Sequence, residues 1–224
     1  MVIAKIKPLE EIYEMIKDKK KILNVGCAGC TALCLAGGQR EVDALNVQIK
    51  KLSKENGQDI QVDGYTVERQ CEMEFIEELD PMERDYDVII SMACGAGVQF
   101  VAEKFTEKPV FPTLNTSFVG VNKDIGWYEE KCRSCGDCQL AYTGGICPVT
   151  RCAKSIFNGP CGGTQDGKCE VSKDILCAWN SIYERLKDQD RLDNISKMKP
   201  IMKWVNQIQG TYVKDEYKDR YTNK

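Results

Sequence analysis

The chain has 224 residues, 42% of them hydrophobic, with 31 Lys and Arg against 34 Asp and Glu, for a net formal charge of −3. This profile is typical of a soluble globular protein with one large domain or two small ones. It disfavours a nucleic-acid-binding role, since such proteins usually carry a basic patch or a high pI. No apolar run reaches the length of a membrane span, and the N-terminus lacks the apolar segment of a secretory signal, so we expect a cytoplasmic protein.

Cysteine and histidine usage is the most unusual feature of the composition. The chain has 13 Cys and no His. An odd cysteine count without a secretory signal argues against a disulfide framework, whereas clustered thiols in a reducing compartment more often bind metal. The absence of histidine excludes mixed Cys/His zinc sites and histidine-based acid–base mechanisms. We therefore expect any soft metal to be held through thiolates.

The first part of the chain, residues 1–126, alternates predicted helices and strands. The expected elements are a helix over 8–20, a strand over 22–25, a helix over about 31–56, a strand around 65–67, a helix over 72–79, a strand over 87–92, a helix to about 105 and a weaker strand over 109–115. Strands separated by helices predict an α/β domain with a small parallel sheet, Rossmann-like or flavodoxin-like, and helices on both faces.

The second part, residues 127–190, has a different composition. Residues 132–177 hold eight Cys and many Gly but few apolar runs, so we expect an irregular domain that bound clusters stabilise. A C-terminal amphipathic helix is expected to follow, with one face formed by Ile175, Leu176, Trp179, Ile182, Tyr183 and Leu186. Residues 191–224 are expected to form a charged helical tail, in which Trp204 either docks on a partner or folds back.

Five cysteines of the first part come after predicted strands. Cys27, Cys30 and Cys34 lie in the loop and helix turn after the first strand, Cys71 follows the second strand, and Cys94 follows the third. Loops that follow parallel strands share one edge of the sheet, which is where open α/β sheets bind ligands. We therefore expect these thiols to meet, and four of them suffice for one four-iron cluster. The preferred set is Cys30, Cys34, Cys71 and Cys94, because Cys27 is nearest the strand.

Three other interpretations of this group stay open. The thiols can be buried structural groups. Cys27 and Cys30 can form a thiol-redox pair, although three further cysteines crowd the same edge. A nucleotide site is less well supported, because the glycine spacings in these loops fall short of a G-x-G-x-x-G fingerprint.

The second part contains a larger group, which comprises Cys132, Cys135, Cys138, Cys147, Cys152, Cys161, Cys169 and Cys177. Its opening C-x2-C-x2-C is the first part of a bacterial ferredoxin run, and a proline follows Cys147 as in that run, although eight residues intervene where the run has three. Eight thiolates suffice for two four-iron clusters. We expect Cys132, Cys135, Cys138 and a later cysteine to hold one cluster, and most of the remaining five to hold the other.

The alternative for this group is a pair of zinc sites with four cysteine ligands each, in an assembly module without a redox role. Zinc also folds segments that lack a core, but the close spacing of the C-x2-C-x2-C favours iron. Four cations, Lys131, Arg133, Arg151 and Lys154, lie among these ligands. They either raise the cluster potential and meet an acidic ferredoxin, or form an ordinary solvated face.

The cysteine-rich part also carries a family resemblance. The stretch GICPVTRCAKSIFNGPCGGT from Gly145, with GKCE from Gly167 and CAWNSIYERL from Cys177, resembles the methylenetetrahydrofolate reductase C-terminal domain family. The N-terminal G-C-x-x-C-x-x-x-C-x-x-G-G and C-G-x-G-V-Q segments are similar to the same family, so the resemblance covers roughly residues 20–190. The core NGPCGG from Asn158 is its specific part, whereas C-x-x-C elements alone are not.

This resemblance implies a stand-alone, non-catalytic iron–sulfur subunit, which acetogenic bacteria and some anaerobes pair with a flavin-bearing large subunit in one-carbon metabolism (the Wood–Ljungdahl pathway). The partner would be a TIM-barrel flavoprotein that reduces 5,10-methylenetetrahydrofolate to 5-methyltetrahydrofolate. Flavin is expected on the partner only, since such a barrel needs about 250 residues. The electron donor stays open among ferredoxin, a nicotinamide-oxidising subunit and a larger complex. With the cysteine groups, we expect three [4Fe-4S] clusters, one N-terminal and two C-terminal.

Overall fold

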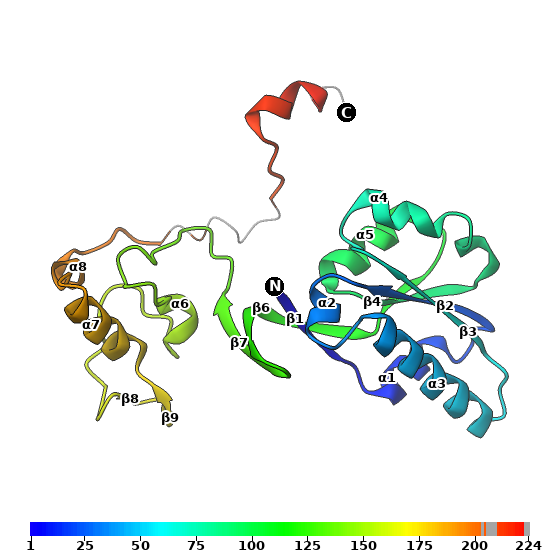
Figure 1. The fold of residues 1–224 in the computed structure, drawn as a ribbon, viewed down its shortest axis with the longest axis horizontal. Helices are drawn as coiled ribbons and strands as arrows, with labels where there is room; N and C mark the ends of the chain where they lie inside the picture. Colours follow the sequence, from blue (N-terminus) through cyan, green and yellow to red (C-terminus); the bar gives the residue numbers. More distant parts are fainter. Residues whose placement is uncertain (203, 205–209, 222–224) are drawn as a thin grey trace. The chain divides into compact units, whose positions relative to one another are not determined.

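The computed structural model describes residues 1–202, 204 and 210–221 (Figure 1). The chain divides into two compact units, Met1–Glu130 and Lys131–Lys224. Each unit is described by itself below. Among the described residues, none of the helices has both the length and the apolar character needed to cross a membrane.

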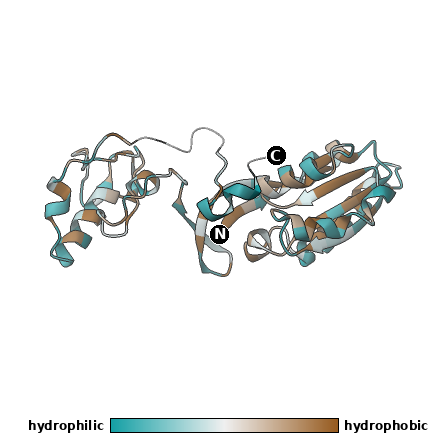
Figure 2. Ribbon diagram, turned by 90° about the horizontal axis from the view of Figure 1, so that it is seen from above, coloured by the Kyte–Doolittle hydropathy of each residue, from teal (hydrophilic) through white to brown (hydrophobic). Residues whose placement is uncertain are grey.

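The first unit is built on a parallel four-stranded sheet. Its strands are β2 (Lys21–Cys27), β3 (Gln61–Val67), β4 (Val88–Met92) and β5 (Val110–Pro112), in the order β3-β2-β4-β5. The central strands β2 and β4 are buried along nearly their whole length, and Figure 2 shows brown, hydrophobic strand segments inside the α/β unit. Burial on both faces is expected of parallel strands that helices cover. The predicted α/β class with a parallel sheet is confirmed.

Helices cover both faces of this sheet. They are α1 (Leu9–Ile16), α2 (Cys30–Leu33), α3 (Gln39–Glu55), α4 (Met73–Ile76) and α5 (Gly95–Lys104), with 3-10 turns η1 (Glu77–Leu79) and η2 (Glu83–Asp85). Figure 1 shows α1 and α3 on one side of the sheet and α4 and α5 on the other. Each side has its own apolar core, which contains buried residues from the strands and from the helices on that side.

The single helix expected over 31–56 is wrong. The chain ends α2 at Leu33, passes through Leu35 with a positive φ of 57°, and begins α3 at Gln39. Gly37 lies between the two helices, and a Cβ there would overlap the carbonyl oxygen of Met92 at the end of β4. The helix breaks because the chain must pass this close to a neighbouring strand, which only glycine permits.

A second, antiparallel sheet of the first unit was not predicted. Its strands are β1 (Val2–Ile6), β6 (Leu114–Asp124) and β7 (Trp127–Cys132), in the order β1-β6-β7. β1 and β6 are more than 100 residues apart in sequence, with Ile6 opposite Leu114 in the register. Such a pairing leaves no local signal, because neither strand is next to its partner in the chain.

The second unit has little regular structure. It contains α6 (Pro148–Arg151), a two-stranded hairpin of β8 (Lys168–Cys169) and β9 (Ser172–Leu176), α7 (Ala178–Asp188), α8 (Asp193–Ser196) and η3 (Asp215–Arg220). Its buried apolar cluster is formed by Trp179, Ile182 and Leu186 of α7, and Val149, Ala178 and Met202 are buried as well. The predicted C-terminal amphipathic helix is therefore present, but it starts later than expected.

Two residues assigned to the face of that helix lie elsewhere. Ile175 and Leu176 belong to β9 and are exposed, and Tyr183 of α7 is also largely exposed. The error arises because β9 runs into α7 with one residue between them, Cys177, so that the apolar spacing continues across the boundary. In the expected tail, 191–224, the short α8 and η3 are the helical segments among the described residues, and residues 203, 205–209 and 222–224 lie outside them.

Candidate metal centres

Four thiols of the first unit gather at the carboxyl edge of the parallel sheet. Cys27 ends β2, Cys30 begins α2, Cys71 follows β3, and Cys94 is the N-cap residue of α5. The pKa of the Cys71 thiol is raised, first by burial and then by electrostatic interaction with Cys27, Cys94 and Cys30. All four lie at a strand end or in the segment that follows one, at the same edge of the sheet. The edge thus brings together side chains that are up to 67 residues apart (94 − 27 = 67).

Cys34, the fifth cysteine of this part, points into the core instead. It is buried, its Sγ accepts a hydrogen bond from the backbone N–H of Ala4 at 3.5 Å, and it lies 3.7 Å from the carbonyl oxygen of Ala4. Burial raises the pKa of the Cys34 thiol as it does that of Cys71, so the position of Cys34 against Ala4 is what sets it apart from the edge thiols. The structure therefore favours Cys27 over Cys34 as the fourth member of the edge group, opposite to the sequence-based preference.

The second unit contains a cavity of about 290 Å³ whose lining includes four cysteines. A single water needs only about 10–15 Å³ of such space, so the cavity has room for a polyatomic group. Its thiols are Cys132, Cys135, Cys138 and Cys147. Of the later cysteines, Cys147 is the one that lines the same cavity as the C-x2-C-x2-C.

The backbone around this cavity is shaped for close wrapping. Ser134 and Gly136 both have positive φ, 52° and 82°, which turns the chain tightly between successive cysteines. The N–H of Ser134 donates a hydrogen bond to Sγ of Cys132 at 3.2 Å. N–H donation to sulfur stabilises thiolates and is one of the ways in which proteins tune iron–sulfur clusters.

Of the other four cysteines of this unit, Cys152 caps the end of α6, Cys161 lies in the loop before β8, Cys169 is in β8 and Cys177 precedes α7. Cys152 and Cys177 both pack against the α7 core, and Cys169 ends β8. The thiol of Cys161 contacts the carboxylate of Glu170 at 3.8 Å, and the same carboxylate pairs with Lys154. Lys154 is therefore part of an ion pair, while Lys131 and Arg133 line the four-thiol cavity and Arg151 ends α6.

The spacing of the thiol and carboxylate side chains decides whether they could share a single metal ion. In the ranges 1–202, 204 and 210–221, no three Cys, Asp or Glu side chains converge closely enough to hold one ion. The four cysteines of the second unit's cavity line a volume of about 290 Å³. Zinc needs four ligands at about 2.3 Å from one centre, whereas a four-iron cluster places its four thiolates around a larger inorganic core. Four thiolates are the ligand set of such a cluster, and the residues that line the cavity supply them.

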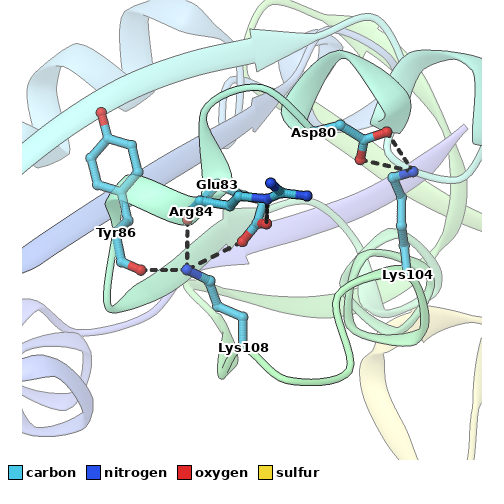
Figure 3. Close-up of polar contacts among 6 residues, drawn as sticks. All are labelled: Asp80, Glu83, Arg84, Tyr86, Lys104 and Lys108. Atoms are coloured by element: carbon cyan, nitrogen blue, oxygen red, sulfur yellow. Dashed lines mark hydrogen bonds and ion pairs between the residues drawn. The ribbon is translucent and has the colours of Figure 1, made fainter.

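A charged pocket at the opposite edge of the parallel sheet has a structural role. Lys108 Nζ binds the carboxylate of Glu83 at 3.2 Å and donates to the backbone carbonyls of Glu83 and Tyr86 (Figure 3). Lys104 pairs with Asp80 at 2.9 Å. These lysines fasten the turns that precede β4 and β5, so their charges are already neutralised by the protein itself.

The C-terminal segment is fastened to the cysteine-rich unit by a residue of the NGPCGG motif. Asn158 Nδ2 donates to the carbonyl oxygen of Lys199 at 2.8 Å, and the N–H of Lys199 donates to Asn158 Oδ1 at 3.0 Å. The ammonium of Lys199 also lies 3.1 Å from the centroid of the Tyr142 ring. Sequence reasoning missed this contact, because a paired asparagine leaves no periodic signal.

The fold and the sites define an α/β unit with an edge of four thiols, followed by a cysteine-rich unit with a four-thiol cavity. Residues 111–205 match the family model described as "Methylene-tetrahydrofolate reductase C terminal". The predicted resemblance is confirmed over this range, which contains all eight cysteines of the second group and the NGPCGG core. No curated protein and no solved structure matches the chain.

Proposed function

We propose that this chain is an iron–sulfur electron-transfer subunit of a methylenetetrahydrofolate reductase complex. The observation that carries the proposal is the cavity lined by Cys132, Cys135, Cys138 and Cys147, inside the segment that matches the reductase family. Four cysteine thiolates are the usual ligand set of a four-iron cluster. A relay of this kind has no catalytic residue of its own.

The proposal includes three [4Fe-4S] clusters. The edge thiols of the first unit, Cys27, Cys30, Cys71 and Cys94, would hold one cluster, and the cavity would hold the second. The remaining cysteines of the second unit, Cys152, Cys161, Cys169 and Cys177, would hold the third. All thirteen cysteines are free thiols, which suits a reducing compartment such as the cytoplasm.

In this role, clusters held by the cysteines would conduct single electrons from a donor, either ferredoxin or a nicotinamide-oxidising subunit, to a flavin on a partner subunit. Reduction of 5,10-methylenetetrahydrofolate to 5-methyltetrahydrofolate takes up two electrons and two protons in total, and the partner would carry it out. The contribution of this chain is thiolate ligation, burial and N–H donation to sulfur, which set the potential of each cluster. Hydride chemistry belongs to the partner's cofactor.

Purification of the full chain without oxygen tests the proposal. The expected result is brown protein that bleaches with dithionite and contains iron and acid-labile sulfide in about equal amounts. Replacement of Cys147 by serine should remove about four iron atoms per chain, whereas Cys34→Ser, which changes a core thiol, should keep them. Colourless protein with stoichiometric zinc would overturn the relay and support a zinc-stabilised assembly module. Co-purification with a flavoprotein would identify the partner.

A further inference from the structure

Gln70 is a fully buried polar side chain at the carboxyl edge of the parallel sheet. Its Nε2 donates to the carbonyl oxygens of Val25 at 2.8 Å and Gly26 at 3.0 Å, and its Oε1 accepts from Ser91 Oγ at 2.6 Å. Both N–H groups of the amide are thereby used, and its oxygen is paired as well. One side chain therefore ties the loop after β3 to the ends of both β2 and β4.

Each segment that Gln70 joins carries one of the edge thiols. Cys71 is its immediate neighbour in the chain, Cys27 directly follows Gly26, and Cys94 lies three residues after Ser91. The hydrogen bonds of the amide thus fix the relative positions of three strand ends, and with them the spacing of three thiols.

The surrounding packing allows the Gln70 side chain little freedom. Gly97, in the first turn of α5, lies against it, since a Cβ on Gly97 would come within 2.9 Å of the Gln70 Cβ. The same Cβ would come within 2.8 Å of the Cβ of Ala93, in the segment that carries Cys94. α5 therefore packs against the Cβ of Gln70, while residues at the strand ends form hydrogen bonds with its amide.

We propose that Gln70 is a positioning residue that preforms the edge site by holding Cys71 beside Cys27 and Cys94. The role of this site in iron binding rests on the proposed function, but the role of Gln70 in thiol placement does not. A glutamate at this position would fail, because a carboxylate has no N–H for the two carbonyls of β2 and brings a negative charge to the thiols. Gln70 itself is no ligand.

The test uses the full chain, freed of metal and reduced, and measures cross-linking between its thiols. The probe is dibromobimane, which bridges two neighbouring thiols, and mass mapping identifies the bridged peptides. We expect wild-type protein to give Cys71 bridged to Cys27 or Cys94, and Gln70→Glu to lose these bridges. Ser91→Ala removes only one hydrogen bond to the amide and should lower their yield in a protein that still folds.

Asn46→Leu is the matched control. Asn46 is also a buried amide, and it accepts a hydrogen bond at 2.8 Å from Asn24 in the middle of β2, away from the strand ends. Asn46→Leu should keep the bridges although it loses one buried side-chain hydrogen bond, as Ser91→Ala does. Unchanged bridging in folded Gln70→Glu or Ser91→Ala protein would overturn the positioning role, as would its equal loss in Asn46→Leu.

Iron content of the same variants gives the second measurement. The positioning role predicts that Gln70→Glu loads less iron than wild type and that Asn46→Leu loads as much. Wild-type protein without iron would refute the proposed function, yet the cross-links would still decide the role of Gln70. The two failures are therefore distinguishable.

Discussion

Replacing Cys34 or Cys27 with alanine distinguishes a structural thiol, Cys34, from a proposed metal ligand, Cys27. The two side chains are almost equally buried, with 6% and 7% of their surface exposed. Loss of one buried heavy atom resembles Ile→Val, so each substitution should cost about 1 kcal/mol of stability in the metal-free protein. Cys34 lies in the core against Ala4, whereas Cys27 lies among the edge thiols. Only Cys27→Ala should therefore also lose iron.

Two assays separate these effects. Urea unfolding of the metal-free chains, followed by the circular dichroism of the α/β unit, should give similar losses for both variants. Metal analysis of chains prepared without oxygen should give wild-type iron for Cys34→Ala and about four fewer iron atoms per chain for Cys27→Ala. The assignment is refuted by the reverse pattern, in which Cys34→Ala loses iron and Cys27→Ala keeps it.

Three further predictions concern the rest of the chain. Metal removal should unfold residues 132–177 and leave the α/β unit folded, and protease resistance of that segment in metal-free protein would contradict this. Hydrogen bonds from the backbone N–H groups of Lys21 and Lys20 lower the pKa of Asp87, so its carboxylate stabilises the fold at neutral pH and loses this effect as the pH falls through that lowered pKa. Asp87→Asn should therefore lower the free energy of unfolding in urea at neutral pH. If the variant is equally destabilised in acid, the ionised carboxylate is not the cause. Asn158→Ala removes the two hydrogen bonds to Lys199 and should speed tryptic cleavage after Lys197, whereas the control Asn115→Ala in β6 should not. Equal cleavage rates in both variants and wild type would show that these hydrogen bonds do not hold the segment around Lys199 in place.

The parallel sheet and the gathering of strand-end cysteines were predictable because both follow from local patterns. Buried strands such as β4 are continuous apolar runs, and parallel strands place the loops that follow them at one edge. Helix α7 was predictable for the same reason, since its buried residues recur at helical spacing. These features can be predicted from residues close together in sequence and from the common direction of parallel strands.

The orientation of Cys34 was not predictable, because it depends on a strand with no local signal. Its Sγ packs on Ala4 of β1, and β1 is held in place by β6, which lies more than 100 residues away. Without that antiparallel sheet, helical spacing alone places Cys34 beside Cys30 and suggests that both face the ligand. The same applies to Gln70, whose partners Val25 and Ser91 are brought to it only by the fold.

The two units differ in what keeps them folded, and this decides where ligand substitutions are informative. The first unit has an apolar core on each face of its sheet, whereas the apolar cluster of the second is built around the single helix α7. If the second unit holds clusters as proposed, loss of a ligand there would remove iron and also loosen the fold, so its iron content has to be read together with a measurement of folding. At the edge of the first unit, the sheet remains when a thiol is lost. Substitutions of Cys71 and Cys94 are consequently the cleanest measure of metal binding, since their effect on iron is read against a fold that does not depend on it.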